Sequence, residues 1–260
     1  MIRVVKIGGS VIEDELKLHE FCHNFAAIEG PKILVHGGGT AASSLQKALG
    51  QTPVKIEGRR VTDSDALKAV TYVYAGWCNK RIVALLQSLE CNATGLSGCD
   101  GNVIRARRRL PRTLSDGVTS VDYGYVGDVD KKSVNAGFLR MLLDGGYVPV
   151  LCAINHDGKG QLLNTNADTV ASSVAAAMHG RLECCFEMDG VLSDRNDPSS
   201  VIPQISEVEF DAMVRSGSVS EGMIPKIENC LYALKNGALE AVIKNSNAIA
   251  IEGIGTRIYL

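Results

Sequence analysis

Lys6 and the glycine pair Gly8-Gly9 are the first residues of the chain whose types and spacing could do chemistry. They follow the apolar pair Val4-Val5, and a helical pattern begins directly after them. This order predicts a buried strand that ends in a tight turn at a helix N-terminus. Glycines let backbone N–H groups approach a ligand, and a helix N-terminus favours phosphate. The stretch therefore indicates a phosphate site that Lys6 could reach, and an ordinary turn with a solvated lysine is the alternative.

A second glycine-rich turn, residues 37–39, follows the apolar strand predicted for residues 32–35. Residues 37–42 read Gly-Gly-Gly-Thr-Ala-Ala and fit the dinucleotide pattern G-x-G-x-x-A, and Glu57 follows near the end of a possible strand at 54–57. This outline is the basis of an alternative function, an NAD(P)-dependent reductase. It leaves Lys6 and the first glycine turn unexplained, so we keep it as the alternative.

A further group of polar residues stands at the start of a predicted helix. Asn164, Asn166 and Asp168 precede a small-residue helix that reaches residue 178. Asn166 suits a helix N-cap and Asp168 a first-turn acid, but three polar groups beside a buried strand favour a substrate site.

Cationic residues supply the other candidates. Arg59 and Arg60 lie in a loop, where a guanidinium could bind a carboxylate bidentately or simply remain exposed. Lys226 falls in the first turn of the last helix, behind Pro225. The helix dipole disfavours a cation there, so an anion nearby would account for its position.

The elements that must position these residues alternate between strands and helices. This alternation predicts a mainly parallel sheet covered on both faces. We expect helices over about 11–28 and 63–89, and a capping box of Thr62 and Asp65 would begin the second of them. A further helix would begin at the capping box of Ser206 and Glu209. The apolar stripe of the 63–89 helix includes Trp77, which predicts core or a subunit interface. Residues 95–125 are expected to form hairpins that lie over the sheet without extending it.

Composition limits the class of protein. The chain has 260 residues, 45% hydrophobic and 22% charged, which is typical of a globular protein with a substantial core. A net charge of −2 argues against nucleic acid as the main partner. The sequence contains no pattern of a membrane span, an export signal or a metal motif. Its scattered cysteines predict buried, reduced thiols in a cytoplasmic protein. The arginine cluster at 105–112 is interpreted as a solvated hairpin.

Taken together, the motifs resemble those of the amino acid kinase family, and the match spans nearly the whole chain. The resemblance depends on seven motifs in the family's order: Lys6–Ser10, His36–Gly39, Gly58–Thr62, Asn164–Asp168, Asp189–Leu192, Gly222–Lys226 and Gly255–Ile258. It implies a three-layer α/β/α sandwich with a mainly parallel central sheet, formed by one domain over residues 1–260. About 1–178 would form the acyl-amino-acid lobe and about 179–260 the ATP lobe.

The family's acylglutamate branch implies an activity. The γ-phosphate of ATP, with Mg²⁺ bound mainly through the nucleotide, would pass to the side-chain carboxylate of N-acetyl-L-glutamate or another N-acyl-glutamate, a step of arginine biosynthesis. By resemblance, Lys6 and Lys226 stabilise the transferring phosphoryl group and Asp168 orients both lysines. A carboxylate nucleophile is already ionised near neutral pH, which agrees with the lack of an evident histidine base.

The remaining site residues follow from the same resemblance. Gly8, Gly9 and Asp189 would bind the nucleotide, whereas Gly38, Gly39, Arg60 and Asn164 would bind the acyl-amino-acid. Phe186, Glu187 and Met188 stand where many relatives have Ser/Thr-Asp, so the nucleotide contacts there are left open. The first strand begins close to Met1, without the extra helix of arginine-inhibited relatives, so we expect a homodimer without arginine feedback. The acyl group stays open between acetyl, succinyl and others.

Overall fold

β1 (Arg3–Ile7) lies in the middle of the main sheet of the computed structural model, which describes residues 1–114, 117–194, 196–219 and 222–260. Within these residues, eight strands form that sheet in the order β14 (Gln204–Ser206), β16 (Thr256–Tyr259), β15 (Glu240–Asn245), β13 (Arg181–Phe186), β1, β2 (Lys32–His36), β10 (Val148–Cys152) and β5 (Ala93–Leu96). Only β15 and β16 pair antiparallel among them. The prediction of a mainly parallel sheet is confirmed.

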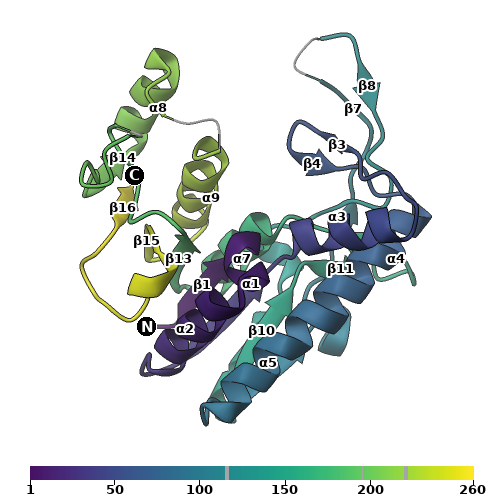
Figure 1. The fold of residues 1–260 in the computed structure, drawn as a ribbon, viewed down its shortest axis with the longest axis horizontal. Coiled ribbons are helices and arrows are strands. Elements are labelled where there is room, and N and C mark those ends of the chain that lie inside the picture. The colour runs from purple at the N-terminus through teal and green to yellow at the C-terminus, as the bar shows by residue number, and fades with distance from the viewer. Residues whose placement is uncertain (115–116, 195, 220–221) are drawn as a thin grey trace.

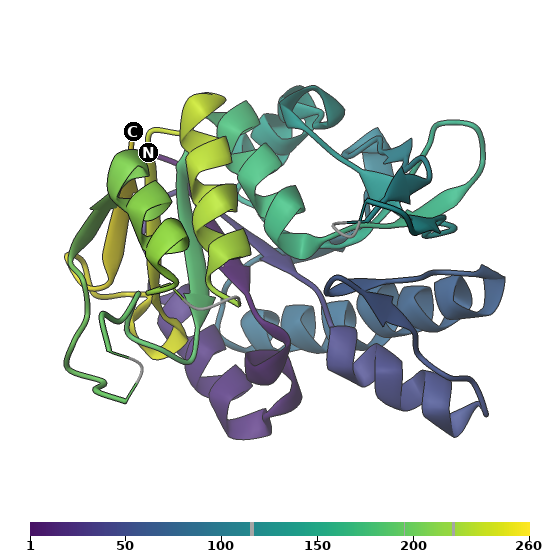
Figure 2. The same cartoon turned by 90° about the horizontal axis from the view of Figure 1, so that it is seen from above.

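Helices cover both faces of this sheet, which gives the three layers (Figures 1 and 2). One layer contains α1 (Gly9–Glu13), α2 (Glu15–Ala26), α3 (Gly39–Ala48), and a continuous helical run of α4 (Ser64–Thr71), a π-helical segment (Tyr72–Cys78) and α5 (Asn79–Ser88). The opposite layer contains α6 (Ala136–Asp144), α7 (Ala167–Met178), α8 (Glu207–Ser216) and α9 (Ile224–Lys235). Each layer packs its own hydrophobic cluster against the sheet.

Short antiparallel ribbons lie beyond the carboxyl ends of the sheet strands. They pair β3 (Lys55–Ile56) with β4 (Arg59–Arg60), β6 (Arg107–Arg108) with β9 (Gly127–Asp128), β7 (Arg112–Thr113) with β8 (Ser120–Val121), and β11 (Ile154–His156) with β12 (Leu162–Asn164). The β3–β4 and β7–β8 ribbons project side by side in Figure 1, and Arg112 pairs with Glu57 across them. Of the stretch 95–125, which was predicted to form hairpins, the β7–β8 ribbon and strand β6 confirm the prediction. Positions 115 and 116 of that stretch lie outside the described residues.

The alternation of side chains along β1 decides where its lysine points. Val4 packs in the cluster shared with α7, whereas Val5 and Ile7 pack in the cluster shared with α2. Because successive strand residues face opposite sides, Lys6 faces the same layer as Val4, which is the α7 layer. The sheet also changes winding direction between β1 and β13, the position where open α/β sheets bind ligands at the carboxyl ends of their strands.

Several local predictions were wrong. Gly95 was assigned to a hairpin region, but it belongs to β5 at the edge of the main sheet, where a Cβ would meet Asn79 Oδ1 at 2.0 Å. This glycine lets α5 pack closely and does not mark a turn. Asp63, not Thr62, is the N-cap of α4 and accepts from the backbone N–H groups of Asp65 and Ala66.

Two helix predictions also need correction. The helix expected over 11–28 is divided at Asp14, which is extended and caps α2. In the helix expected over 63–89, Trp77 is 67% exposed, so of its two predicted roles the core is wrong and the subunit interface stays a prediction. By contrast, the capping box of Ser206 and Glu209 at the start of α8 is confirmed.

Candidate active site

Lys6 and Asp168 form an ion pair at the carboxyl end of β1. The Lys6 ammonium lies 2.8 Å from Asp168 Oδ1, and both side chains are largely buried, with 11% and 18% exposed. Asp168 reaches this position because Asn166 caps α7, accepting from the N–H groups of Asp168 and Thr169, which places Asp168 in the first helical turn. The two residues that the sequence singled out on separate elements are therefore in direct contact.

The pair holds both groups in their charged forms. Burial disfavours the charge on Lys6, but attraction to Asp168 and their hydrogen bond outweigh it, so the pKa of Lys6 is raised. Burial likewise opposes ionisation of Asp168, and the charge of Lys6 with a smaller contribution from Lys226 leaves the pKa of Asp168 lowered. A fixed ammonium at a strand end is suited to stabilise negative charge on a bound group.

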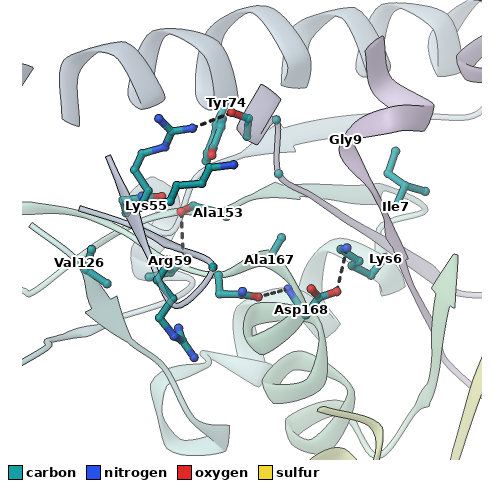
Figure 3. A pocket seen from close by; sticks show the side chains of 18 residues that line it. Lys6, Ile7, Gly9, Lys55, Arg59, Tyr74, Val126, Ala153, Ala167 and Asp168 are labelled. Atoms are coloured by element: carbon teal, nitrogen blue, oxygen red, sulfur yellow. Dashed lines mark hydrogen bonds and ion pairs between the residues drawn. The ribbon is translucent and has the colours of Figure 1, made fainter. Parts of the chain in front are cut away.

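A pocket of about 260 Å³ opens beside this pair (Figure 3). The residues that line it are Lys6, Ile7, Gly9, Gly37, Gly38, Gly39, Lys55, Gly58, Arg59, Arg60, Tyr74, Val126, Ala153, Asn164, Thr165, Asn166, Ala167 and Asp168. Gly38 has a φ of +152°, and a Cβ there would meet the Tyr74 ring at 3.0 Å. The glycine turn therefore brings its backbone close to Tyr74 at a distance that a side chain would prevent.

Arg60 lies buried on one wall of this pocket and is held by neutral acceptors. Its guanidinium donates to Gly39 O and Ser43 Oγ at 2.7 Å each, and also to Gln46 Oε1. No carboxylate is paired with it among the residues that the structure describes. Its positive charge thus remains available to an anionic ligand, in a fixed orientation.

Asn164 presents an unpaired acceptor on the pocket wall. Its side-chain amide donates to Thr62 Oγ1 at 3.1 Å, while its buried Oδ1 has no hydrogen-bond partner in the described structure. A buried amide oxygen without a donor is costly, so this atom is suited to accept from an N–H group of a ligand.

Of the residues predicted to bind nucleotide, Gly9 lines this pocket, whereas Gly8 and Asp189 do not. Within the described residues, its lining does not include Lys226 either. The Lys226 ammonium lies 3.4 Å from Gly222 O and 5.6 Å from the centre of the Phe186 ring. Asp189 accepts from Asn245 Nδ2 at 2.8 Å. Among the described residues, Asp168 forms an ion pair with Lys6, whereas Lys226 acts on it only through the attraction of their charges. That Asp168 orients both lysines stays a prediction.

Sequence reasoning missed several residues of the site. Tyr74 belonged to an apolar helical stripe, which predicted a core residue, and Lys55 carried no signal at all. Arg59 was considered together with Arg60, but only the fold shows that both line the pocket from the β3–β4 ribbon.

The dinucleotide alternative does not fit the topology. In the main sheet, β2 is paired with β1 and β10, whereas Glu57 stands in the turn of the β3–β4 ribbon with a φ of 46°. The acidic residue of a dinucleotide fingerprint must instead end a neighbouring strand of the same sheet. The reductase interpretation is therefore wrong.

A protein-family model for the amino acid kinase family matches residues 1–245. The chain belongs to this family. Among curated members, the acetylglutamate kinase of Phocaeicola vulgatus is 48% identical over 259 residues, 98% of this chain and 97% of that protein. The acetylglutamate kinase of Bacteroides fragilis is 46% identical over 261 residues, with 99% and 96% covered.

Solved structures of the family share the fold. The protein smu.665 of Streptococcus mutans superposes with a TM-score of 0.76 at 26% identity, covering 99% of this chain and 98% of that one. N-acetylglutamate synthase from Neisseria gonorrhoeae, complexed with coenzyme A and N-acetyl-glutamate, gives a TM-score of 0.81 at 23% identity. This chain is fully covered in that comparison but spans only 59% of the synthase. The predicted family and fold are thus confirmed.

Proposed function

We propose that this protein is an N-acylglutamate kinase, which transfers the γ-phosphoryl group of ATP to the side-chain carboxylate of N-acetylglutamate or a close analogue. Relatives named acetylglutamate kinase match at 46% and 48% identity over nearly the whole chain, which supports this reaction. The observation that carries the proposal is the buried Lys6–Asp168 pair, which directs a fixed ammonium at a pocket with further cations.

The chain's own groups account for the reaction by positioning and charge. The attacking carboxylate is ionised at neutral pH and needs no base. Phosphoryl transfer requires alignment of the reactants and stabilisation of charge on the phosphoryl oxygens, with little covalent chemistry from the protein. Lys6 supplies that charge at the pocket, and Asp168 holds the ammonium in place and keeps it protonated.

The opposite wall of the pocket suits the rest of an N-acylated amino acid. Arg60 offers its charge to the α-carboxylate, because its guanidinium has only neutral partners in the described structure. Asn164 Oδ1 offers an acceptor to the amide N–H of the acyl group. Gly38 and Gly39 contribute backbone at the same wall. We propose these four residues as the substrate-binding set.

We assign the nucleotide to the β13 side of β1, with Gly8, Gly9, Asp189 and Lys226 as the residues that bind it. In this assignment residues 1–178 form the acyl-amino-acid lobe and 179–260 the ATP lobe. The described residues contain no cluster of three His, Cys, Asp or Glu side chains arranged for a metal ion. In this proposal Mg²⁺ would be held mainly by the nucleotide's phosphate oxygens, where the ion would neutralise phosphate charge.

We also propose a homodimer that forms through the π-helical segment. Tyr72 and Trp77 are 62% and 67% exposed there, and they border a groove shared with Leu45 and Arg81. Exposed aromatic residues next to an apolar groove are typical of protein interfaces. A Trp77→Glu variant should shift the protein from dimer to monomer in light scattering coupled to size exclusion, whereas Leu110→Glu, an equally exposed control, should not.

An ATP-dependent hydroxylamine-trapping assay tests the function, because hydroxylamine converts an acyl phosphate into a coloured hydroxamate. The substrates are N-acetylglutamate, N-succinylglutamate, glutamate, aspartate and N-acetyl-aminoadipate. Turnover confined to N-acylglutamates is the expected result and agrees with a role in arginine biosynthesis in the cytoplasm. Turnover of glutamate or aspartate alone would overturn the proposal.

No helix in the described part of the chain is long and apolar enough to cross a membrane.

A further inference from the structure

The substrate pocket contains more positive charge than N-acetylglutamate can neutralise. Its lining includes four cationic residues and one acid, and Asp168 is already paired with Lys6. N-acetylglutamate has two carboxylates, one for transfer at the Lys6 end and one for Arg60. Lys55 lies opposite Arg60 in the β3–β4 ribbon and can share the carboxylate at Arg60. Arg59 then remains without an anionic partner from this substrate.

Arg59 differs from the arginines around it. Arg109 is paired with Asp128 and Arg112 with Glu57, whereas Arg59 has no ion pair or hydrogen bond to a side chain among the described residues. Arg59 is half-buried, and burial together with the charge of Arg109 lowers its pKa. The nearby Asp128 attracts Arg59, but this carboxylate is already paired with Arg109. A half-buried guanidinium without an ion pair of its own is an unfavourable arrangement in the free protein. A bound anion would relieve it.

The position of Arg59 relates it to one end of the substrate. Figure 3 shows Lys6 and Asp168 on one side of the pocket and Lys55 and Arg59 on the other, with Val126 near Arg59. A substrate that places its reacting carboxylate at Lys6 therefore directs its opposite end towards the β3–β4 ribbon. The Val126 side chain is 5% exposed and offers an apolar surface to methylene groups of a substrate that extends from Lys6 to the ribbon.

We propose that the acyl group of the preferred substrate itself ends in a carboxylate, as in N-succinylglutamate, and that Arg59 binds this third carboxylate. The inference rests on the proposed kinase function and specifies its substrate class. It assigns Arg59 as a specificity-determining residue, distinct from Arg60 next to it. The two are adjacent in β4, so their side chains leave opposite faces of the ribbon and can serve different carboxylates.

Steady-state kinetics with three substrates test the inference. N-acetylglutamate lacks the third charge, N-butyrylglutamate has the length of the succinyl compound without the charge, and N-succinylglutamate has both. We expect kcat/KM for N-succinylglutamate to exceed that of the other two by about tenfold or more, the usual effect of a charged hydrogen bond. Equal values for the butyryl and succinyl compounds would overturn the inference, because length alone would then explain the preference.

The variant Arg59→Gln sharpens the test. We expect the ratio of kcat/KM for N-succinylglutamate to that for N-acetylglutamate to fall about tenfold. Lys55→Gln should leave this ratio nearly unchanged, because Lys55 lies opposite Arg60 in the ribbon and shares its face. Arg107→Gln is the matched control, since Arg107 lies on the neighbouring β6, is 72% exposed, pairs with Asp130 and does not line the pocket. An equal loss with both substrates in Arg59→Gln would show a purely structural role for Arg59.

The two proposals fail in different ways. If no compound yields a hydroxamate or ADP, the kinase function fails. Calorimetric binding of N-succinylglutamate and N-acetylglutamate without ATP then still tests the third-carboxylate site. Tighter binding of the succinyl compound that is lost in Arg59→Gln supports the site, and equal binding of both compounds rejects it.

Discussion

The two lysines predicted to act on the phosphoryl group have very different surroundings. Lys6 is buried, lies 2.8 Å from Asp168 and has a raised pKa. Lys226 is only partly buried, and its ammonium has a carbonyl oxygen at 3.4 Å and an aromatic ring at 5.6 Å as its partners in the described structure. One cation is fixed by a carboxylate, and the other is held weakly.

This difference shows how the two halves of the site are built. In the half that we propose to bind the acyl-amino-acid, charges are oriented before a ligand arrives, by Asp168 for Lys6 and by Gln46 and Ser43 for Arg60. In the half that we propose to bind the nucleotide, Lys226 has no ion pair with a carboxylate among the described residues. Preorganised groups accelerate a reaction without reorganising during it, whereas weakly held groups must become ordered when the ligand binds. The following predictions test this contrast, from the largest expected effect to the smallest.

Removing the two lysines gives the largest effects and separates their roles. Lys6→Met should lower kcat by about 10³-fold, because one preorganised charge on a transition-state oxygen is worth this much. Lys226→Met should lower kcat by about 10²-fold and raise the KM for ATP more than Lys6→Met does. Initial rates at varied ATP and substrate measure both, with circular dichroism as the check of folding. Equal changes in both variants would contradict the contrast.

Asp168→Asn tests whether the ion pair keeps Lys6 charged. Without the carboxylate, burial alone acts on the ammonium and should lower the pKa of Lys6 below its ordinary 10.5. We expect kcat to fall about 10²-fold and its decline at high pH to begin at lower pH than in the parent protein. A pH–rate profile measures this shift. An unshifted profile would show that Asp168 serves only to orient Lys6.

Arg60→Gln probes the preorganised substrate end. Losing a charge-assisted contact to a carboxylate should raise the KM for the acylglutamate by about 10- to 100-fold with a smaller change in kcat. Substrate saturation curves at fixed ATP measure the change. The KM for ATP is the internal control and should stay within about twofold, since Arg60 lines only the acyl-amino-acid pocket. A fall in kcat without a rise in KM would exclude the proposed contact.

His36, which ends β2 before the glycine turn, gives the smallest effect. Its Nδ1 donates to Gly37 O at 2.8 Å and its Nε2 accepts from Asn79 Nδ2 at 3.0 Å, while burial lowers the pKa of His36 to about 4. The imidazole of His36 therefore binds a proton near pH 6.5 in the unfolded state but only near pH 4 in the folded state. As a result, the free energy of unfolding falls as the pH falls between these values. This linkage corresponds to about 2 kcal/mol of unfolding free energy between pH 6.5 and 5.

Urea denaturation across this pH range measures the effect. The fall in unfolding free energy should be reduced in His36→Asn and retained in His19→Asn, because His19 is exposed. An identical pH dependence in both variants would show that His36 does not cause the decline.

Several parts of the fold and site were predictable from local pattern alone. The strand around Lys6, the cap at Asn166, the helix behind Pro225 and the capping box at Ser206 are all confirmed. Each depends on residues within one turn or strand, where propensity and capping act directly. The errors lie where packing decides. Gly95 was interpreted as a turn residue because sequence does not show that α5 approaches it closely.

By itself, the sequence determined the alternating architecture, the family and the residues at each strand end and helix start that carry charge. Only the tertiary structure decided which of these groups meet. It placed Asp168 against Lys6 and not against Lys226, and it brought Lys55, Arg59 and Tyr74 to one pocket from a ribbon and a helix. The physical reason is that local pattern fixes the direction of a side chain within its own element, whereas contacts between elements depend on the packing of helices and ribbons around the sheet.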